Sequence, residues 1–110
     1  MIKNLGVFAI AAFFEIAGCF AFWLWIRRGA GLPVATLGIV SLIAFAVVLT
    51  RADSAFAGRA YAAYGGIYIA ASLLWLSIVE RQRPTVTDLL GAGIAIAGAL
   101  VIIGFASKAP

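Results

Sequence analysis

Residues 5–26 read LGVFAIAAFFEIAGCFAFWLWI, an apolar run that contains one charged side chain, Glu15. An apolar run of this length is typical of a transmembrane helix. At 1.5 Å per residue, Glu15 lies roughly 16 Å from a helix start near Asn4, close to the midplane of the bilayer core. A carboxyl group at that depth is costly to insert, so we interpret Glu15 as a functional group. The alternative is a protonated side chain that only holds helices together.

The rest of the chain repeats this pattern. Of its 110 residues, 65% are hydrophobic and 11% are charged. Apolar runs at residues 4–26, 34–50, 60–79 and 89–106 predict four transmembrane helices. Glycine, proline and polar residues separate the runs at residues 27–33, 51–59 and 80–88. We therefore predict an all-α membrane protein, with a single four-helix transmembrane domain over residues 1–110.

The composition also excludes several classes of function. Four spans leave no room for a soluble domain, and no nucleotide-binding motif is present. The chain has no histidine and one cysteine, Cys19, which excludes the usual zinc sites and a disulfide framework within one chain. The net charge is +4, but the basic residues flank the apolar runs, which indicates topology control and contact with lipid headgroups. We expect no enzymatic activity, no cofactor and no nucleic-acid partner.

Two helical faces carry side chains suited to a pocket. On the first span, the residues that share a face with the acid are Phe8, Ala11, Gly18 and Phe22. On the third span, an arc of about 80° holds Tyr61, Tyr64, Tyr68, Ser72 and Trp75. Tyr68 is too deep for an interfacial aromatic belt, so we expect its hydroxyl to have a partner inside the protein. We interpret these faces as pocket walls, with simple helix packing as the alternative.

The fourth span has no ionisable side chain, and small residues dominate one of its faces. The residues that share this face are Gly91, Ala95, Gly98 and Ile102. Such a face is typical of close helix packing. It fits a seam between two chains as well as packing within one chain, and the pattern does not separate the two.

Three polar residues are expected to act locally. On the second span, Ser41 is expected to bond a backbone carbonyl of its own helix. Thr87 or Asp88 is expected to cap the fourth helix.

The basic residues are balanced across the predicted membrane. With four spans, the termini and the middle loop share one side. That side carries Lys3, Arg51, Arg59 and Lys108, and the other carries Arg27, Arg28, Arg81 and Arg83. Because orientation follows Lys/Arg asymmetry, this balance allows insertion in both orientations and antiparallel dimers of one chain. The alternative is a fixed orientation set by the order of insertion or by charge position.

Three segments resemble a known family. They are FFEIAGC at residues 13–19, AYAAYGG at residues 60–66, and ERQR at residues 80–83 followed by Asp88, Gly91 and Gly98. Together they resemble the YnfA family of small bacterial inner-membrane proteins. That family is similar in turn to the small multidrug resistance transporters, which are proton-coupled antiporters of cations and work as antiparallel homodimers.

The resemblance implies roles for single residues. Glu15 would bind protons and substrate in turn, Tyr61 would match the transporters' third-helix tyrosine, and Gly91 and Gly98 would lie in the dimer seam. Tyr64 stands where the transporters have a tryptophan. The first span also carries more bulk than theirs, in Phe13, Phe14, Trp23 and Trp25.

These observations predict a proton-coupled efflux transporter in the bacterial inner membrane, an antiparallel homodimer that exports small organic cations, quaternary ammonium or aromatic. Glu15 would couple cation to proton, and the rings of the pocket would face the cation. One rival is an ion channel built on a dual-topology dimer, although the second and fourth spans offer little of the polar file that it needs. Another rival is a non-transporting subunit of a larger membrane complex.

Overall fold

The computed structural model describes residues 2–53 and 56–105, which form four α-helices and no strand. They are α1 (Ile2–Arg28), α2 (Leu32–Leu49), α3 (Ala57–Ile78) and α4 (Val86–Phe105). Each is long and apolar enough to cross a membrane. The predicted all-α, four-span fold is confirmed. The expected bounds agree within three residues, and the expected end of the fourth span at residue 106 and Lys108 lie outside the described residues.

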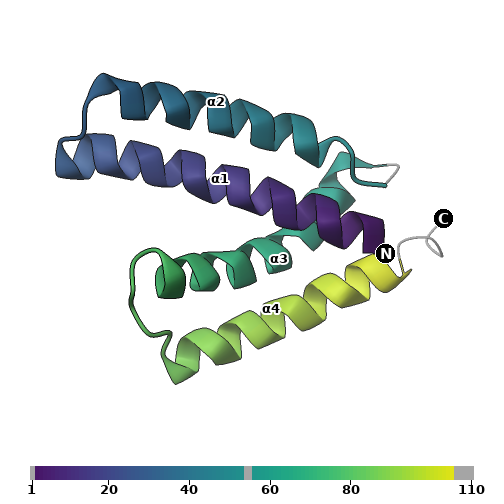
Figure 1. The fold of residues 1–110 in the computed structure, drawn as a ribbon. Helices are drawn as coiled ribbons and strands as arrows, with labels where there is room; N and C mark the ends of the chain where they lie inside the picture. Colours follow the sequence, from purple (N-terminus) through teal and green to yellow (C-terminus); the bar gives the residue numbers. More distant parts are fainter. Residues whose placement is uncertain (1, 54–55, 106–110) are drawn as a thin grey trace.

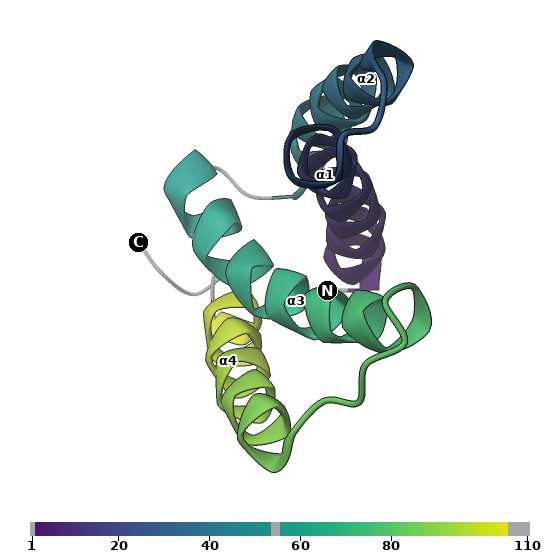
Figure 2. The same cartoon turned by 90° about the vertical axis from the view of Figure 1, so that its left-hand side faces the viewer.

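The helices form two hairpins, α1–α2 and α3–α4, which meet where α1 packs on α3 (Figures 1 and 2). The start of α1, the end of α4 and the α2–α3 connection lie at one end of the molecule (Figure 1). The α1–α2 and α3–α4 connections lie at the other end. Each hairpin therefore crosses the long dimension of the molecule twice, as two adjacent spans would cross a bilayer.

Small residues let α1 and α2 approach closely. A methyl group added at Gly18 would lie 2.7 Å from Leu42 Cγ, and one at Gly38 would lie 3.1 Å from the Gly18 carbonyl oxygen. Ser41 Oγ donates a hydrogen bond across this seam to the Phe14 carbonyl, at 2.7 Å. The prediction that Ser41 bonds its own helix is wrong, because the close approach puts a carbonyl of α1 within its reach. Such polar contacts stabilise helix pairs inside membranes.

Thr85 caps α4. Its side-chain oxygen accepts a hydrogen bond from the Asp88 N–H at 3.1 Å, and Asp88 Oδ2 accepts one from the Thr85 N–H at 2.9 Å. This reciprocal pair is a capping box that satisfies two backbone donors at the helix start. The expected cap is wrong for Thr87, since α4 begins earlier than expected and its N-cap residue is Thr85, but Asp88 takes part in the cap from the first turn.

Two further contacts join the hairpins. Phe8 and Ala12 on α1 are buried against Ala63 and Tyr64 on α3. At the end of the molecule, the Asp53 N–H donates to Asn4 Oδ1 at 2.7 Å, and Asn4 Nδ2 donates to the Asp53 carbonyl at 3.4 Å. The contact between Asn4 and Asp53 holds the α2–α3 connection against the first turn of α1.

Gly66 determines how closely α3 and α4 pack. A methyl group added there would lie 2.5 Å from Ala99 Cβ and 2.6 Å from the Ala95 carbonyl oxygen, whereas one at neighbouring Gly65 would meet nothing within 4 Å. We predict that Gly66→Ala lowers the free energy of unfolding by about 1–3 kcal/mol, because the helices must separate.

Gly65→Ala is the matched control and is expected to be neutral or slightly stabilising, since alanine is the better helix former. Unfolding in mixed detergent micelles, followed by circular dichroism, measures both variants. Equal effects of the two substitutions would contradict the packing described for Gly66.

Candidate functional site

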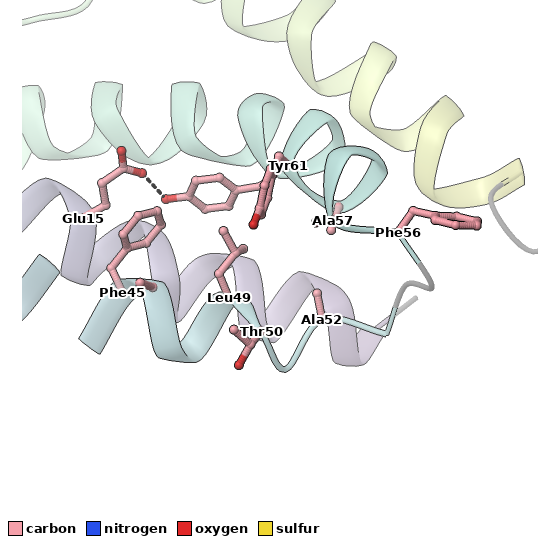
Figure 3. A pocket seen from close by; sticks show the side chains of 11 residues that line it. Glu15, Phe45, Leu49, Thr50, Ala52, Phe56, Ala57 and Tyr61 are labelled. Carbon is pink, nitrogen blue, oxygen red and sulfur yellow. Dashed lines mark hydrogen bonds between the residues drawn. The ribbon is translucent and has the colours of Figure 1, made fainter. Parts of the chain in front are cut away.

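Glu15 lies at the midpoint of α1, which runs Ile2–Arg28. Its partner is Tyr64 on α3, whose hydroxyl donates a hydrogen bond to Glu15 Oε1 at 2.6 Å (Figure 3). A hydroxyl that donates to an ionised carboxylate forms a strong, charge-assisted bond. The basic residues in the described part of the chain stand in connections or in terminal turns of helices. Glu15 is therefore stabilised by a neutral donor within the chain, which leaves its negative charge to be balanced from outside.

The hydroxyl of Tyr64 is held in place by its ring. Only 7% of Tyr64 is exposed. Its ring centre lies 5.8 Å from that of Phe8, 5.7 Å from that of Phe45 and 5.9 Å from that of Tyr68. Separations in this range are favourable for aromatic pairs. Side chains from α1, α2 and α3 thus fix the hydroxyl that donates to Glu15.

A cavity of about 570 Å³ lies beside Glu15 (Figure 3). It extends from the carboxylate along the end of α2 and the start of α3. Its other lining residues are Phe45, Ala46, Leu49, Thr50, Ala52, Phe56, Ala57, Ala60, Tyr61 and Tyr64. This volume and this mostly apolar wall, with a few polar groups, are typical of small-molecule sites. Because residues of the α2–α3 connection line it, the cavity faces that end of the molecule.

The aromatic residues of α3 that were expected to line one pocket are divided between two cavities. Tyr61 and Tyr64 lie beside Glu15 in this cavity. Tyr68 and Trp75 line a second cavity, of about 290 Å³, between α1 and α3. Ser72, from the same stripe, also lines the second cavity, and its hydroxyl donates to the Tyr68 carbonyl at 2.8 Å.

The small residues expected beside the acid line neither cavity. Ala11 is fully buried in the core that contains Tyr64. Gly18 and Phe22 pack against Gly38 on α2. The site around Glu15 is therefore built with rings from α2 and α3. Of the small residues of α1, Gly18 serves the contact with α2, and Ala11 serves the core that contains Tyr64.

Sequence reasoning missed the contribution of α2 and the connection after it. Phe45, Leu49 and Thr50 line the cavity, as do Ala52 and Phe56 from the connection. One signal was present, because Phe45 is the only aromatic residue in α2. An aromatic residue in the span after the acid does not by itself predict a contact with that acid. The contact follows only from how the two helices pack.

The expected α4 seam divides into two kinds of residue. Gly91 and Gly98 are exposed, and a methyl group at either would meet nothing within 4 Å. Ala95 contributes the carbonyl that approaches Gly66, and Ile102 packs against the core. The two glycines thus leave an open face, while the other two residues serve packing within the chain.

The fold and the site define a multi-pass membrane protein with a carboxylate at mid-span in a cavity lined by aromatic rings. A family model described as "Uncharacterised BCR, YnfA/UPF0060 family" matches residues 1–109. The chain therefore belongs to the YnfA/UPF0060 family, as its motifs predicted.

Relatives of similar length carry the name UPF0060 membrane protein. One from Pseudomonas syringae pv. syringae is 55% identical over 96 residues, and one from Ectopseudomonas mendocina is 53% identical over 96 residues. In each case the match covers 87% of this chain and 87% of the relative. One from Pseudomonas aeruginosa is 54% identical, covering 87% of this chain and 88% of its own. No solved structure matches the chain significantly.

The bond between Tyr64 and Glu15 predicts an energetic coupling that a double-mutant cycle can measure. We expect Tyr64→Phe and Glu15→Gln to be coupled by about 1–3 kcal/mol in the free energy of unfolding, as for a hydrogen bond to a charged group. Tyr61→Phe is the matched control, because Tyr61 lines the same cavity but the bond to Glu15 comes from Tyr64. We expect its coupling to Glu15→Gln to be near zero. A Tyr64 cycle no larger than the Tyr61 cycle would exclude the bond.

Proposed function

We propose that this protein exports small organic cations across the bacterial inner membrane in exchange for protons, as an antiparallel homodimer. The observation that carries the proposal is the position of Glu15. It is an acid at the midpoint of a transmembrane helix, on the wall of a cavity of about 570 Å³ that also contains Tyr61, Phe45 and Phe56. Acids inside membranes mark ion and substrate pathways.

The exchange follows from the cost of a bare charge in the membrane. A carboxylate at mid-span requires a counter-charge or a proton. Tyr64 supplies one hydrogen bond to Oε1 of Glu15 and no positive charge. An organic cation in the cavity and a proton on the carboxyl group are thus two ways to neutralise the same site. Because they exclude each other, binding of one releases the other.

The rings of the cavity favour organic cations over simple metal ions. Cation–π contacts contribute about 0.5–2 kcal/mol each, and more when the cation is shielded from water. Tyr61 is 57% exposed, so its ring keeps surface for a ligand, whereas the guanidinium of Arg59 already lies 5.9 Å from the ring centre of Phe56. Leu49 and the alanines of the wall give such a ligand an apolar surface and few oxygen ligands for a hard metal ion.

An antiparallel dimer would give this site access to both sides of the membrane. The cavity of one protomer faces the end with the α2–α3 connection, so an inverted partner presents the same cavity to the opposite side. The balanced Lys/Arg count supports both orientations, and the open face at Gly91 and Gly98 is suited to close contact with another helix. The arrangement is equivalent to the inverted repeats of larger transporters.

The test measures binding of the fluorescent aromatic cation 6-methoxy-N-ethylquinolinium to the detergent-solubilised protein as a function of pH. For the wild type we expect affinity to rise with pH, because protons compete for the same carboxylate. Glu15→Gln should lose this pH-dependent component, and Glu15→Asp should retain it with a different midpoint.

Asp53→Asn is the matched control, since Asp53 is an acid that lines neither of the two cavities. It should bind the cation as the wild type does. Equal, pH-independent binding by wild type and Glu15→Gln would exclude Glu15 as the coupling group and favour a role in helix packing.

A further inference from the structure

The second cavity, of about 290 Å³, has the chemistry of a binding site in its own right. Glu15 does not line it. Its walls come from α1 and α3 and include four aromatic side chains, one thiol and one carboxylate. These are Phe20, Trp23, Tyr68, Trp75, Cys19 and Glu80. The cavity extends past the end of α3 at Ile78, so it faces the end of the molecule opposite to the Glu15 cavity.

One side chain that lines this cavity already contacts a cation. The guanidinium carbon of Arg27 lies over the ring of Trp23, 4.5 Å from the ring centre. A cation within about 6 Å of an indole centre is held by the ring's electron density. Arg27 is one turn further along the same helix, and its contact shows that the ring of Trp23 accepts a planar cation.

Trp75 forms the opposite part of the wall. Its ring packs edge-on against Phe20, with centres 5.5 Å apart, and more loosely against Phe13 at 6.4 Å. In the described part of the chain, the buried indole nitrogen of Trp75 has no hydrogen-bond partner. A buried donor without a partner is unfavourable. Within the described residues, the ring is therefore positioned by its contacts with Phe20 and Phe13 and not by a hydrogen bond.

Glu80 gives the site its charge. It follows α3, is exposed and lines the cavity at its outer end. The exposed side chains of Arg81 and Arg83 follow it in the chain and weaken its attraction for a cation. Ring contacts must therefore supply much of the affinity, which favours planar aromatic cations over small aliphatic ones.

We propose that this cavity is a second binding site for planar aromatic cations, in which Trp75 and Phe20 contact the ligand, Glu80 is its counter-ion, and Arg27 competes with it for Trp23. The two sites then lie towards opposite ends of each protomer. The rings of Tyr64 and Tyr68, with centres 5.9 Å apart, lie on the walls of the first and the second site respectively.

The thiol of Cys19 can report whether a ligand occupies this cavity. Cys19 is the only cysteine in the chain, is exposed and lines the cavity. The experiment measures the rate at which N-ethylmaleimide alkylates Cys19 in the full-length Glu15→Gln protein, which removes the acid of the first site. We expect 6-methoxy-N-ethylquinolinium to slow alkylation in a saturable way. Its uncharged analogue 6-methoxyquinoline, at a pH where it is neutral, should protect less well.

Substitutions test the role proposed for each residue of the second cavity. Glu80→Gln should lower the affinity for the cation about two- to fivefold and leave that for the neutral analogue unchanged, as expected for an exposed ion pair. Trp75→Leu should weaken protection by both compounds, whereas Trp75→Phe, which keeps a ring, should restore much of it. Arg27→Gln should raise the affinity for the cation. Asp53→Asn and Trp25→Leu change an acid and a tryptophan outside both cavities and should have no effect.

Two results would overturn the proposal. One is an unchanged rate of Cys19 alkylation in the Glu15→Gln protein at every concentration of the cation. The other is equal protection by the cation and its neutral analogue, both in the Glu15→Gln protein and in the same protein with Glu80→Gln added. Neither depends on the exchange at Glu15, because the readout is the thiol of the second cavity and the background lacks the Glu15 carboxylate.

Discussion

The hydrogen bond from Tyr64 to Glu15 is the interaction around which the structure is arranged. A carboxylate at mid-span is unfavourable without a partner. Here the neutral hydroxyl of Tyr64 donates to Glu15 Oε1 at 2.6 Å. That donor must be held rigidly, so Phe8 on α1 and Phe45 on α2 pack on its ring. A single half-buried acid at mid-span therefore depends on three helices in register. It also remains able to take a proton or a cation, because the described residues form no ion pair with it.

The helix seams make this arrangement possible. Gly18 and Gly38 bring α2 close to α1, and Gly66 brings α4 close to α3. Between the hairpins, Phe8, Phe45 and Tyr68 pack around Tyr64. Both cavities lie there or beside it, and both have walls from α1 and α3. Glycines bring the two helices of each hairpin close together, and aromatic side chains line the space beside them. A chain of 110 residues can therefore hold two ligand-sized cavities.

The sequence predicts part of this account well. Apolar runs of about 17 to 23 residues, the range of transmembrane helices, predict four helices, and the lone acid in the first run predicts the depth of Glu15. Helical periodicity also finds Tyr61, Tyr64, Tyr68 and Trp75 on one face. It does not show that the face serves two cavities, because periodicity describes one helix and not its neighbours. For the same reason the sequence predicts a bond from Ser41 to its own helix and no role for Phe45, since the contacts of both residues depend on how closely α2 packs.

The central claim is that a cation and a proton compete for Glu15, and proton release tests it most directly. Adding 6-methoxy-N-ethylquinolinium to weakly buffered, detergent-solubilised protein should release protons from the wild type, in proportion to the cation bound at that site. Glu15→Gln should release none, even where the cation still binds elsewhere on the protein. The same proton release from Glu15→Gln as from the wild type, or cation binding to the wild type without any release, would contradict the account.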